Sequence, residues 1–285
     1  NINMAYTDID KPSDYFNTIL YTGNNTDNTS ITGVGFQPDW VWLKARNQAD
    51  YHYSMDSVRG ALKPLFQNDT SAEANFSDSL KSFNTDGFTL GTSGDLNAAS
   101  QTMVAWNWKA GGSASNNTDG NTTTSVSVNQ DAGFSIMKYA GDGNDSTIGH
   151  GLGAKPEYII FKEIDGAESW RVWSKYTPDT ASKALALNLT DAAFSQSGWI
   201  GAISTSTISI GTDSSINTNG NNYIAYAFAP KKGFSSAGSY VGNGNNDGTF
   251  IWTGQKSAFV LVKRTDATAN WSLIDNTRDP FNVTY

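Results

Sequence analysis

Three segments of the chain repeat the same chemistry at the same spacing. Each begins with a tyrosine followed two positions later by a glycine, and each ends with an apolar strand-like run and a lysine 23 positions after the tyrosine. These segments are residues 21–44, 139–162 and 240–263. An internal repeat of this kind means that one structural unit recurs along the chain, so the fold must be built from copies.

The first two copies continue to match well beyond the lysine. A Phe-Thr-Leu-Gly run at residues 88–91 corresponds to Ile-Ser-Ile-Gly at 208–211, and Val-Ala-Trp-Asn-Trp at 104–108 corresponds to Ile-Ala-Tyr-Ala-Phe at 224–228. The third copy has no counterpart of either run. We therefore expect two complete units and an incomplete third one. Either the natural chain continues beyond Tyr285, which is the favoured interpretation, or the third unit borrows strands from elsewhere.

The composition indicates that these units are made of β-strands. Aromatic residues are abundant, with 9 Trp, 12 Tyr and 14 Phe, which is incompatible with disorder even though only 38% of residues are hydrophobic. Short apolar runs separated by Gly-, Asn- and Asp-rich turns are typical of β-sandwiches. We predict an all-β fold of tandem β-sandwich repeats, jelly-roll-like, with little helix.

The repeat also predicts the domain boundaries. Residues 57–66 and 180–189 are expected to be short helices or loops that cross a sheet. The predicted segments are a first unit with an N-terminal arm over 1–112, a flexible linker over 113–132, a second unit over 133–232 and an incomplete third unit over 233–285. Within the linker, the alternating run at 125–128 is the alternative: a strand.

Two kinds of strand are distinguished by their alternation. Residues 40–44 are apolar on both faces, which is typical of a central strand covered on both sides. In residues 104–108 the large side chains share one face, while Ala105 and Asn107 share the other. Alternation predicts a core face and a small-residue face. The small face either meets solvent or packs against a neighbouring layer.

Charge and cysteine content exclude several functional classes. The formal net charge is −8 and the 19 basic residues form no run, so a nucleic-acid partner is not expected. No apolar stretch is long enough to span a membrane, and no secretory signal pattern precedes residue 20. The chain has no cysteine, which excludes disulfides and thiolate metal sites.

No constellation of catalytic residues is evident. The two histidines occupy different places in their units: the repeat aligns His52 with Trp170 and Trp271, whereas His150 lies between two glycines. Most acidic residues precede glycines in turns, although the loop at 141–145 offers oxygen atoms that could bind calcium. We predict no enzyme activity and no cofactor, and we assign no catalytic, cofactor-binding or metal-binding residue; ligand-binding residues stay open.

Several repeated or conspicuous side chains have structural interpretations. Asp56 and Arg59, like Asp275 and Arg278, are predicted to form an ion pair that anchors a crossing loop; the second unit has Ser174 and Thr177 there instead. The lysines that end the apolar strands are expected to reach water or an acidic partner. Five tryptophans are expected to pack in the core, with stacking on sugars as the alternative: Trp170, Trp173, Trp199, Trp252 and Trp271.

Several runs resemble a family of marine tailed-phage virion proteins. The similar runs are MAYTDIDKPS at 4–13, YTGN at 21–24, GFQPDWVWLK at 35–44, DSVRGA at 56–61, FNTDGF at 83–88 and VAWNWKAGG at 104–112. The resemblance implies a virion component, often tail-fibre-like, with a start near Met4. It supplies no catalytic residues.

We therefore expect a non-enzymatic structural protein on the exterior of a tailed-phage particle: a fibre, a spike or a capsid decoration. Its expected partners are other virion proteins and copies of itself, as a trimer if it is a fibre, with a role in host attachment as an extension. The alternative is a lectin-like module that recognises host surface glycans. A polysaccharide-degrading enzyme is the third and weakest hypothesis.

Overall fold

The computed structural model describes residues 7–179 and 182–279, and the fold over these residues is built almost entirely from antiparallel strands. The all-β prediction is confirmed. The helical elements are a 3-10 turn, η1 (Pro12–Asp14), and two four-residue helices, α1 (Gly94–Asn97) and α2 (Ser214–Asn217). None of the described helices is long and apolar enough to cross a membrane. The predicted start at Met4 lies outside the described residues.

The first unit consists of two sheets that share a core. Its strands are β1 (Phe16–Thr22), β2 (Thr29–Thr32), β3 (Trp40–Ala45), β4 (Tyr53–Asp56), β5 (Gly60–Phe66), β6 (Leu80–Asn84), β7 (Gly87–Leu90) and β8 (Thr102–Trp108). One sheet has the order β1-β8-β3-β4-β5 and the other β2-β7-β6. Apolar side chains of both sheets meet between them, including Val41 and Leu43 of β3 and Phe88 of β7.

The second unit repeats this plan with a wider large sheet. Its strands are β9 (Ser115–Asn117), β10 (Thr124–Asn129), β11 (Phe134–Ala140), β12 (Ser146–Gly149), β13 (Tyr158–Glu163), β14 (Arg171–Ser174), β15 (Lys183–Ala186), β16 (Phe194–Ser195), β17 (Ile200–Ile203), β18 (Thr207–Ile210) and β19 (Asn222–Phe228). The large sheet has the order β16-β15-β14-β13-β19-β11-β10-β9, and β12-β18-β17 faces it across a second core. The residues that pack between the two sheets therefore lie at corresponding positions of the repeat in both units.

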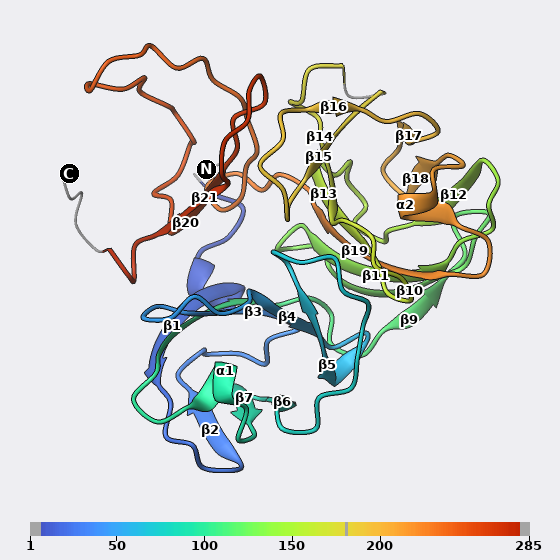
Figure 1. The fold of residues 1–285 in the computed structure, drawn as a ribbon. Coiled ribbons are helices and arrows are strands. Elements are labelled where there is room, and N and C mark those ends of the chain that lie inside the picture. Colours follow the sequence, from blue (N-terminus) through green and yellow to red (C-terminus); the bar gives the residue numbers. More distant parts are fainter. Residues whose placement is uncertain (1–6, 180–181, 280–285) are drawn as a thin grey trace, which may run out of the picture.

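The third unit is a single hairpin sheet in the part of the chain that the structure describes. It contains β20 (Phe259–Val262) and β21 (Ser272–Asp275), which pair with each other. Figure 1 shows the first unit at the bottom, the second at the upper right and the third at the upper left, around a common centre.

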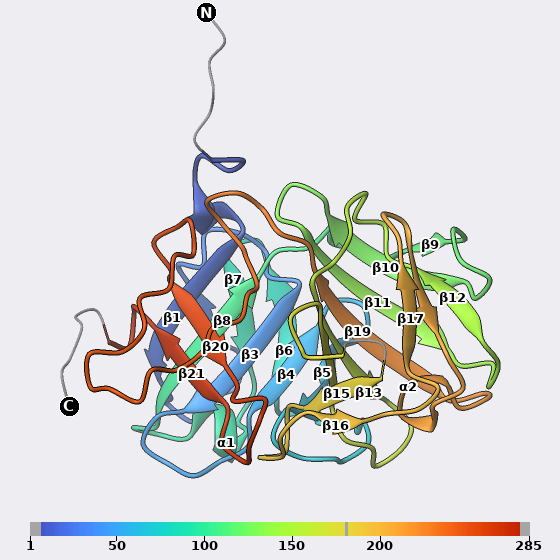
Figure 2. The ribbon, with the colours of Figure 1, turned by 90° about the horizontal axis from the view of Figure 1, so that it is seen from above.

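A third apolar core fills that centre and joins the three units. It contains Trp40 and Trp106 from the first unit, Ile160 and Tyr226 from the second, and, partly buried against them, Phe259 from the third. Figure 2 shows the large sheets of the first two units side by side with β20 and β21 in front of the first. The large apolar faces of the first and second units are thus buried in the shared core, and each of these two units also encloses a core of its own.

This arrangement corrects the interpretation of the small-residue faces. Ala105 and Asn107 are fully buried, because the face that carries them meets the small sheet of its own unit. Trp106, on the opposite face, lies in the shared core between units. The expectation that the small face meets solvent is therefore wrong, and the alternative of a closely packed layer holds.

Two segments differ from their predicted structure. The predicted linker over 113–132 contains β9 and β10, and β10 pairs with β11 over residues 125–129, so the alternative of a strand at 125–128 is confirmed. Val126 and Thr124 are buried there, so this part is a sheet component and no flexible connection. Within the predicted crossing segments, residues 60–66 and 183–186 are strands β5 and β15, because β5 pairs with β4 and β15 pairs with β14 in the large sheets.

Candidate functional site

The three units meet through polar contacts that recur from one pair of units to the next. The contacts are of three kinds, and each kind uses corresponding positions of the repeat. An aromatic–carboxylate contact joins the aromatic residue at the middle of β8 or β19 to an aspartate in another unit. An indole–carbonyl contact joins a tryptophan to a backbone oxygen. An amide–carbonyl contact joins two backbones.

The first aromatic–carboxylate contact is made by Tyr226 of β19 and Asp56 at the end of β4. The tyrosine hydroxyl donates to Asp56 Oδ2 at 2.7 Å, and Arg59 Nε donates to the same oxygen at 2.6 Å. Both side chains of the Asp56–Arg59 ion pair are fully buried. Desolvation by burial, with the neighbouring Asp56 charge second, raises the pKa of Tyr226, so its hydroxyl stays a donor.

The second aromatic–carboxylate contact is made by Trp106 of β8 and Asp275 of β21. The Trp106 indole N–H donates to Asp275 Oδ2 at 3.1 Å, and Arg278 also donates to that oxygen. The Arg278 guanidinium lies over the Trp106 ring, 4.9 Å from its centroid, in a cation–π arrangement. The ion pairs expected in the first and third units are both present, and each receives an aromatic donor from another unit.

The indole–carbonyl and amide–carbonyl contacts each occur twice. Trp170 Nε1 donates to the Phe66 carbonyl at 2.7 Å, and Trp271 Nε1 donates to the Ala186 carbonyl at 2.8 Å. The backbone pairs that follow the same pattern are Glu73 N to Ile164 O at 2.8 Å and Ala193 N to Thr265 O at 2.9 Å. Each donor and each acceptor has its counterpart one unit further along the repeat, so the contacts have a fixed cyclic direction.

The strand-ending lysines close the loop that follows their own strand. Lys44 Nζ donates to the carbonyls of Ala45 and Gln48, and Lys162 Nζ donates to those of Glu163 and Gly166. Lys263 follows the same pattern with Arg264 and Ala269. The expected route to water or an acidic partner is wrong for Lys162, which is completely buried under the following loop, whereas Lys44 and Lys263 are partly exposed. Burial lowers the pKa of Lys162 to about 8.

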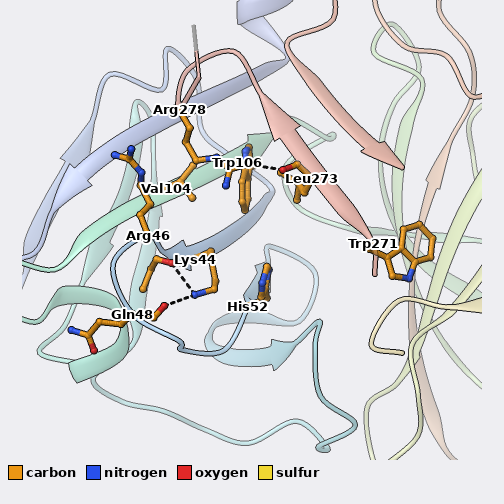
Figure 3. A pocket seen from close by; sticks show the side chains of 10 residues that line it. Lys44, Arg46, Gln48, His52, Val104, Trp106, Trp271, Leu273 and Arg278 are labelled. Atoms are coloured by element: carbon orange, nitrogen blue, oxygen red, sulfur yellow. Dashed lines mark hydrogen bonds between the residues drawn. The ribbon is translucent and has the colours of Figure 1, made fainter. Parts of the chain in front are cut away.

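A pocket of about 480 Å³ lies where the first and third units meet (Figure 3). Its walls carry Lys44, Arg46 and His52 from the first unit, and Trp271 and Arg278 from the third. The lining contains three basic side chains and no carboxylate. It therefore offers neither an acid–base pair of the glycosidase type nor a nucleophile next to a base.

His52 in this pocket is tied to its own unit. Its Nδ1 accepts a hydrogen bond from Trp42 Nε1 at 3.1 Å. Burial, with the charges of Lys44 and Arg278 adding to it, lowers the pKa of His52 to about 4. The imidazole is therefore neutral at physiological pH and packs as an aromatic side chain, in the position that Trp170 and Trp271 take in the other units.

The remaining residues considered from the sequence do not gather in one place. His150 is fully buried, and its Nδ1 accepts from the Leu152 amide in the second unit. Asp142 accepts hydrogen bonds from the Asn144 amide and from the side chain of Asn217. Over residues 7–179 and 182–279, no three His, Asp or Glu side chains are grouped to hold a metal ion.

The tryptophans that were candidates for sugar stacking mostly pack inside. Trp170, Trp173 and Trp199 are buried, and Trp271 is partly buried against the shared core. Trp252 differs, because 81% of its surface is exposed.

Two buried asparagines were missed from the sequence. Asn97 Nδ2 donates to the Gly91 carbonyl, and its Oδ1 accepts from the Asn24 amide; Asn217 makes the corresponding bonds to Gly211 and Asp142. Each asparagine lies six positions after its glycine. The register of the repeat contained this signal, but asparagine is so frequent in the chain that the match does not stand out.

A family model described as "Domain of unknown function (DUF7483)" matches residues 11–285. No curated protein and no solved structure matches the chain.

Proposed function

We propose that this chain, which belongs to the DUF7483 family, is a non-enzymatic structural protein of a tailed-phage particle. The family description carries no function. The virion assignment comes from the resemblance of the sequence motifs, and the architectural role is supported by the structure of the joints between units. These two supports are independent of each other.

The observation that carries the architectural role is the use of the repeated polar residues. The Asp–Arg pairs, the strand-ending lysines, the two buried asparagines and the indole donors all bind within a unit or between units. Lys44, Trp271 and Arg278 also line the pocket between the first and third units, but their donor groups bind oxygen atoms of the protein itself. Here that chemistry fixes the units against one another, which suits a rigid building block of a particle.

The proposed location is the exterior of the virion, as a fibre, spike or capsid decoration. Other virion proteins and further copies of the chain are the proposed partners, with a trimer expected if the protein is a fibre. The net charge of −8 and the scattered basic residues support a role without nucleic acid.

The test is to purify particles of a phage that encodes this chain and to search them for it. Mass spectrometry of density-banded particles should detect the chain at a stoichiometric level. Antibody labelling in electron microscopy should place it on the particle surface. Absence from particles that contain their other structural proteins would overturn the virion role.

Recognition of host glycans is a second candidate, and Trp252 is the observation that favours it. Counted back from the lysine, Trp252 stands where the other units have Gly33 and Gly151, so the repeat assigns it no packing partner. An exposed indole face can stack on a sugar ring. A glycan array should show binding that Trp252→Ala removes, with Trp173→Phe, a buried position, as a control that retains it. An array without binding would exclude this candidate for the glycans displayed.

A further inference from the structure

The inner face of the third unit is exposed where the other units are closed. Val260 of β20 is 36% exposed, whereas Val41 at the corresponding position of β3 is completely buried. Ile274 of β21 is 55% exposed, and its counterpart Met55 in β4 is again completely buried. Phe250, at 84%, corresponds to Ile31, which packs in the core of the first unit. The third unit thus has the side chains of a sandwich interior without the sheet that would cover them.

The edge of β20 shows the same difference. Strand β3 lies between β4 and β8, and β13 lies between β14 and β19. Strand β20 pairs with β21 alone among the described residues, so the edge that faces β8 or β19 in the other units is open. An open strand edge with an apolar face beside it is a template for another strand.

A repeated glycine indicates how close the covering segment comes. A Cβ atom on Gly23 would lie 2.2 Å from the Ala98 carbonyl oxygen, and one on Gly141 would lie 2.4 Å from that of Thr218. Those carbonyls belong to the segments that lead into β8 and β19. A Cβ atom on Gly242, the third member of the set, would meet nothing within 4 Å. The glycine is required for a contact that the third unit does not make over the described residues.

Among the described residues, the third unit also lacks some of the polar contacts that join the other units. If the cyclic pattern were complete, three more contacts would involve the third unit. One is an indole–carbonyl contact donated from the position of His52. The others are an amide–carbonyl contact accepted by the Arg46 carbonyl and an aromatic contact donated to the position of Ser174. Each would need a third-unit residue that corresponds to one found in β5, β8 or the segment between them, and these positions lie outside the described residues. The pocket lined by Arg46 and His52 lies at one of these places.

We infer that the open edge of β20 and the exposed face of the third unit form an acceptor for a polypeptide strand. The occupant is a segment from outside these 285 residues that repeats the pattern of β8 and β19, with large apolar or aromatic side chains on one face and small ones on the other. Strands β8 and β19 of a second copy cannot serve, because each is already central in its own sheet. This inference does not depend on the virion role.

The first test extends the chain with its own second unit. Residues 178–232 are appended directly after Arg278, since Thr177 corresponds to Arg278 in the repeat. Amide hydrogen exchange of residues 259–262 should slow by at least about tenfold relative to the 285-residue chain. Gly242→Ala should lower the melting temperature of the extended protein and leave that of the 285-residue chain unchanged.

A matched control separates strand capture from a general effect of added mass. In the control extension, the residues that copy Ile224, Tyr226 and Phe228 are replaced by serine. The control should leave exchange of residues 259–262 as fast as in the 285-residue chain. Equal protection by both extensions, or by neither, would overturn the inference.

A second measurement covers the case in which the extension does not fold. A labelled synthetic peptide of residues 220–231 should bind the 285-residue chain saturably in fluorescence anisotropy. Val260→Asp should weaken this binding at least about tenfold, and Leu20→Asp, a change on an exposed position of β1, should not. An unfolded extension together with a peptide that does not bind would overturn the inference. So would sedimentation that shows the acceptor already covered in a dimer that Val260→Asp dissociates.

Discussion

The hydroxyl group of Tyr226 donates a hydrogen bond to Asp56 across 170 positions of the chain, inside a core that belongs to two units. The carboxylate it reaches is also bound by Arg59, so one buried aspartate links an ion pair in the first unit to a central strand of the second. The same relationship joins Trp106 to Asp275. These contacts make the stability of one unit depend on its neighbour.

Replacing Tyr226 by phenylalanine should destabilise the protein by about 1–3 kcal/mol, because a buried carboxylate loses one of its donors. The measurement is the free energy of unfolding in urea. Tyr51→Phe is the matched control, since Tyr51 is 46% exposed, and it should change the free energy by less than about 0.5 kcal/mol. Equal effects of the two substitutions would contradict the role given to the hydroxyl group.

Replacing Arg59 by leucine should be more damaging than replacing Arg278 by leucine. Arg59→Leu leaves the Asp56 carboxylate buried without its cation, for which about 3–5 kcal/mol is expected. Arg278 is 27% exposed, and water can reach the site, so its loss should cost less than half as much. Urea unfolding of the two variants gives the comparison. A larger loss of stability in Arg278→Leu than in Arg59→Leu would contradict this prediction. It would mean that the shared core tolerates Asp56 without its cation.

His52 should make the protein less stable in mild acid. Its folded pKa of about 4 lies below the unfolded value of 6.5, so the unfolded chain binds the proton first as the pH falls. The stability contributed by the neutral imidazole is complete above pH 6.5 and is lost towards pH 4, by about 2 kcal/mol at pH 5.

The check on His52 is the difference in unfolding free energy between the wild type and His52→Gln at pH 7 and pH 5. Glutamine can still accept the hydrogen bond of Trp42 but does not titrate. The wild type should lose about 2 kcal/mol more than the variant between these pH values. Parallel pH profiles would show that His52 is not the group responsible.

Lys162 should give a pH dependence of the same sign in the alkaline range. Its folded pKa of about 8 lies below the unfolded value of 10.5, so the folded state releases the proton first as the pH rises. Stability should therefore increase from pH 8 to pH 10 by about 2–3 kcal/mol. Lys162→Met should abolish this increase, whereas Lys155→Met, at an exposed lysine of the same unit, should retain it. A flat wild-type profile would refute the prediction.

Part of this architecture was predictable from residue spacing. The constant distance from tyrosine to lysine identified three equivalent units, and the shared Asp–Arg spacing identified the ion pairs of the first and third units. Both signals are local, because each lies within one unit and recurs in another. The all-β class followed from alternation and from turn residues for the same reason.

The contacts between units were not predictable in this way. Nothing in the alternation of residues 104–108 tells which of two buried faces meets the small sheet and which meets another unit. The donors Trp106 and Tyr226 differ chemically, so their common role is visible only once both reach an aspartate. Likewise, the short strand over 115–117 is entirely polar, and its place in the sheet depends on its partner β10.

The cyclic arrangement of three units in one chain has a consequence for how its interfaces can diverge. In a ring of three identical chains, any substitution at a joint appears three times at once. Here each joint is encoded by its own residues, so one can keep a buried Asp56–Arg59 pair while another has Ser174 and Thr177 at the same positions. A single covalent chain can therefore have three different interfaces around one centre. Substitutions can strengthen or weaken one interface, or adapt it to another partner, without changing the residues of the other two.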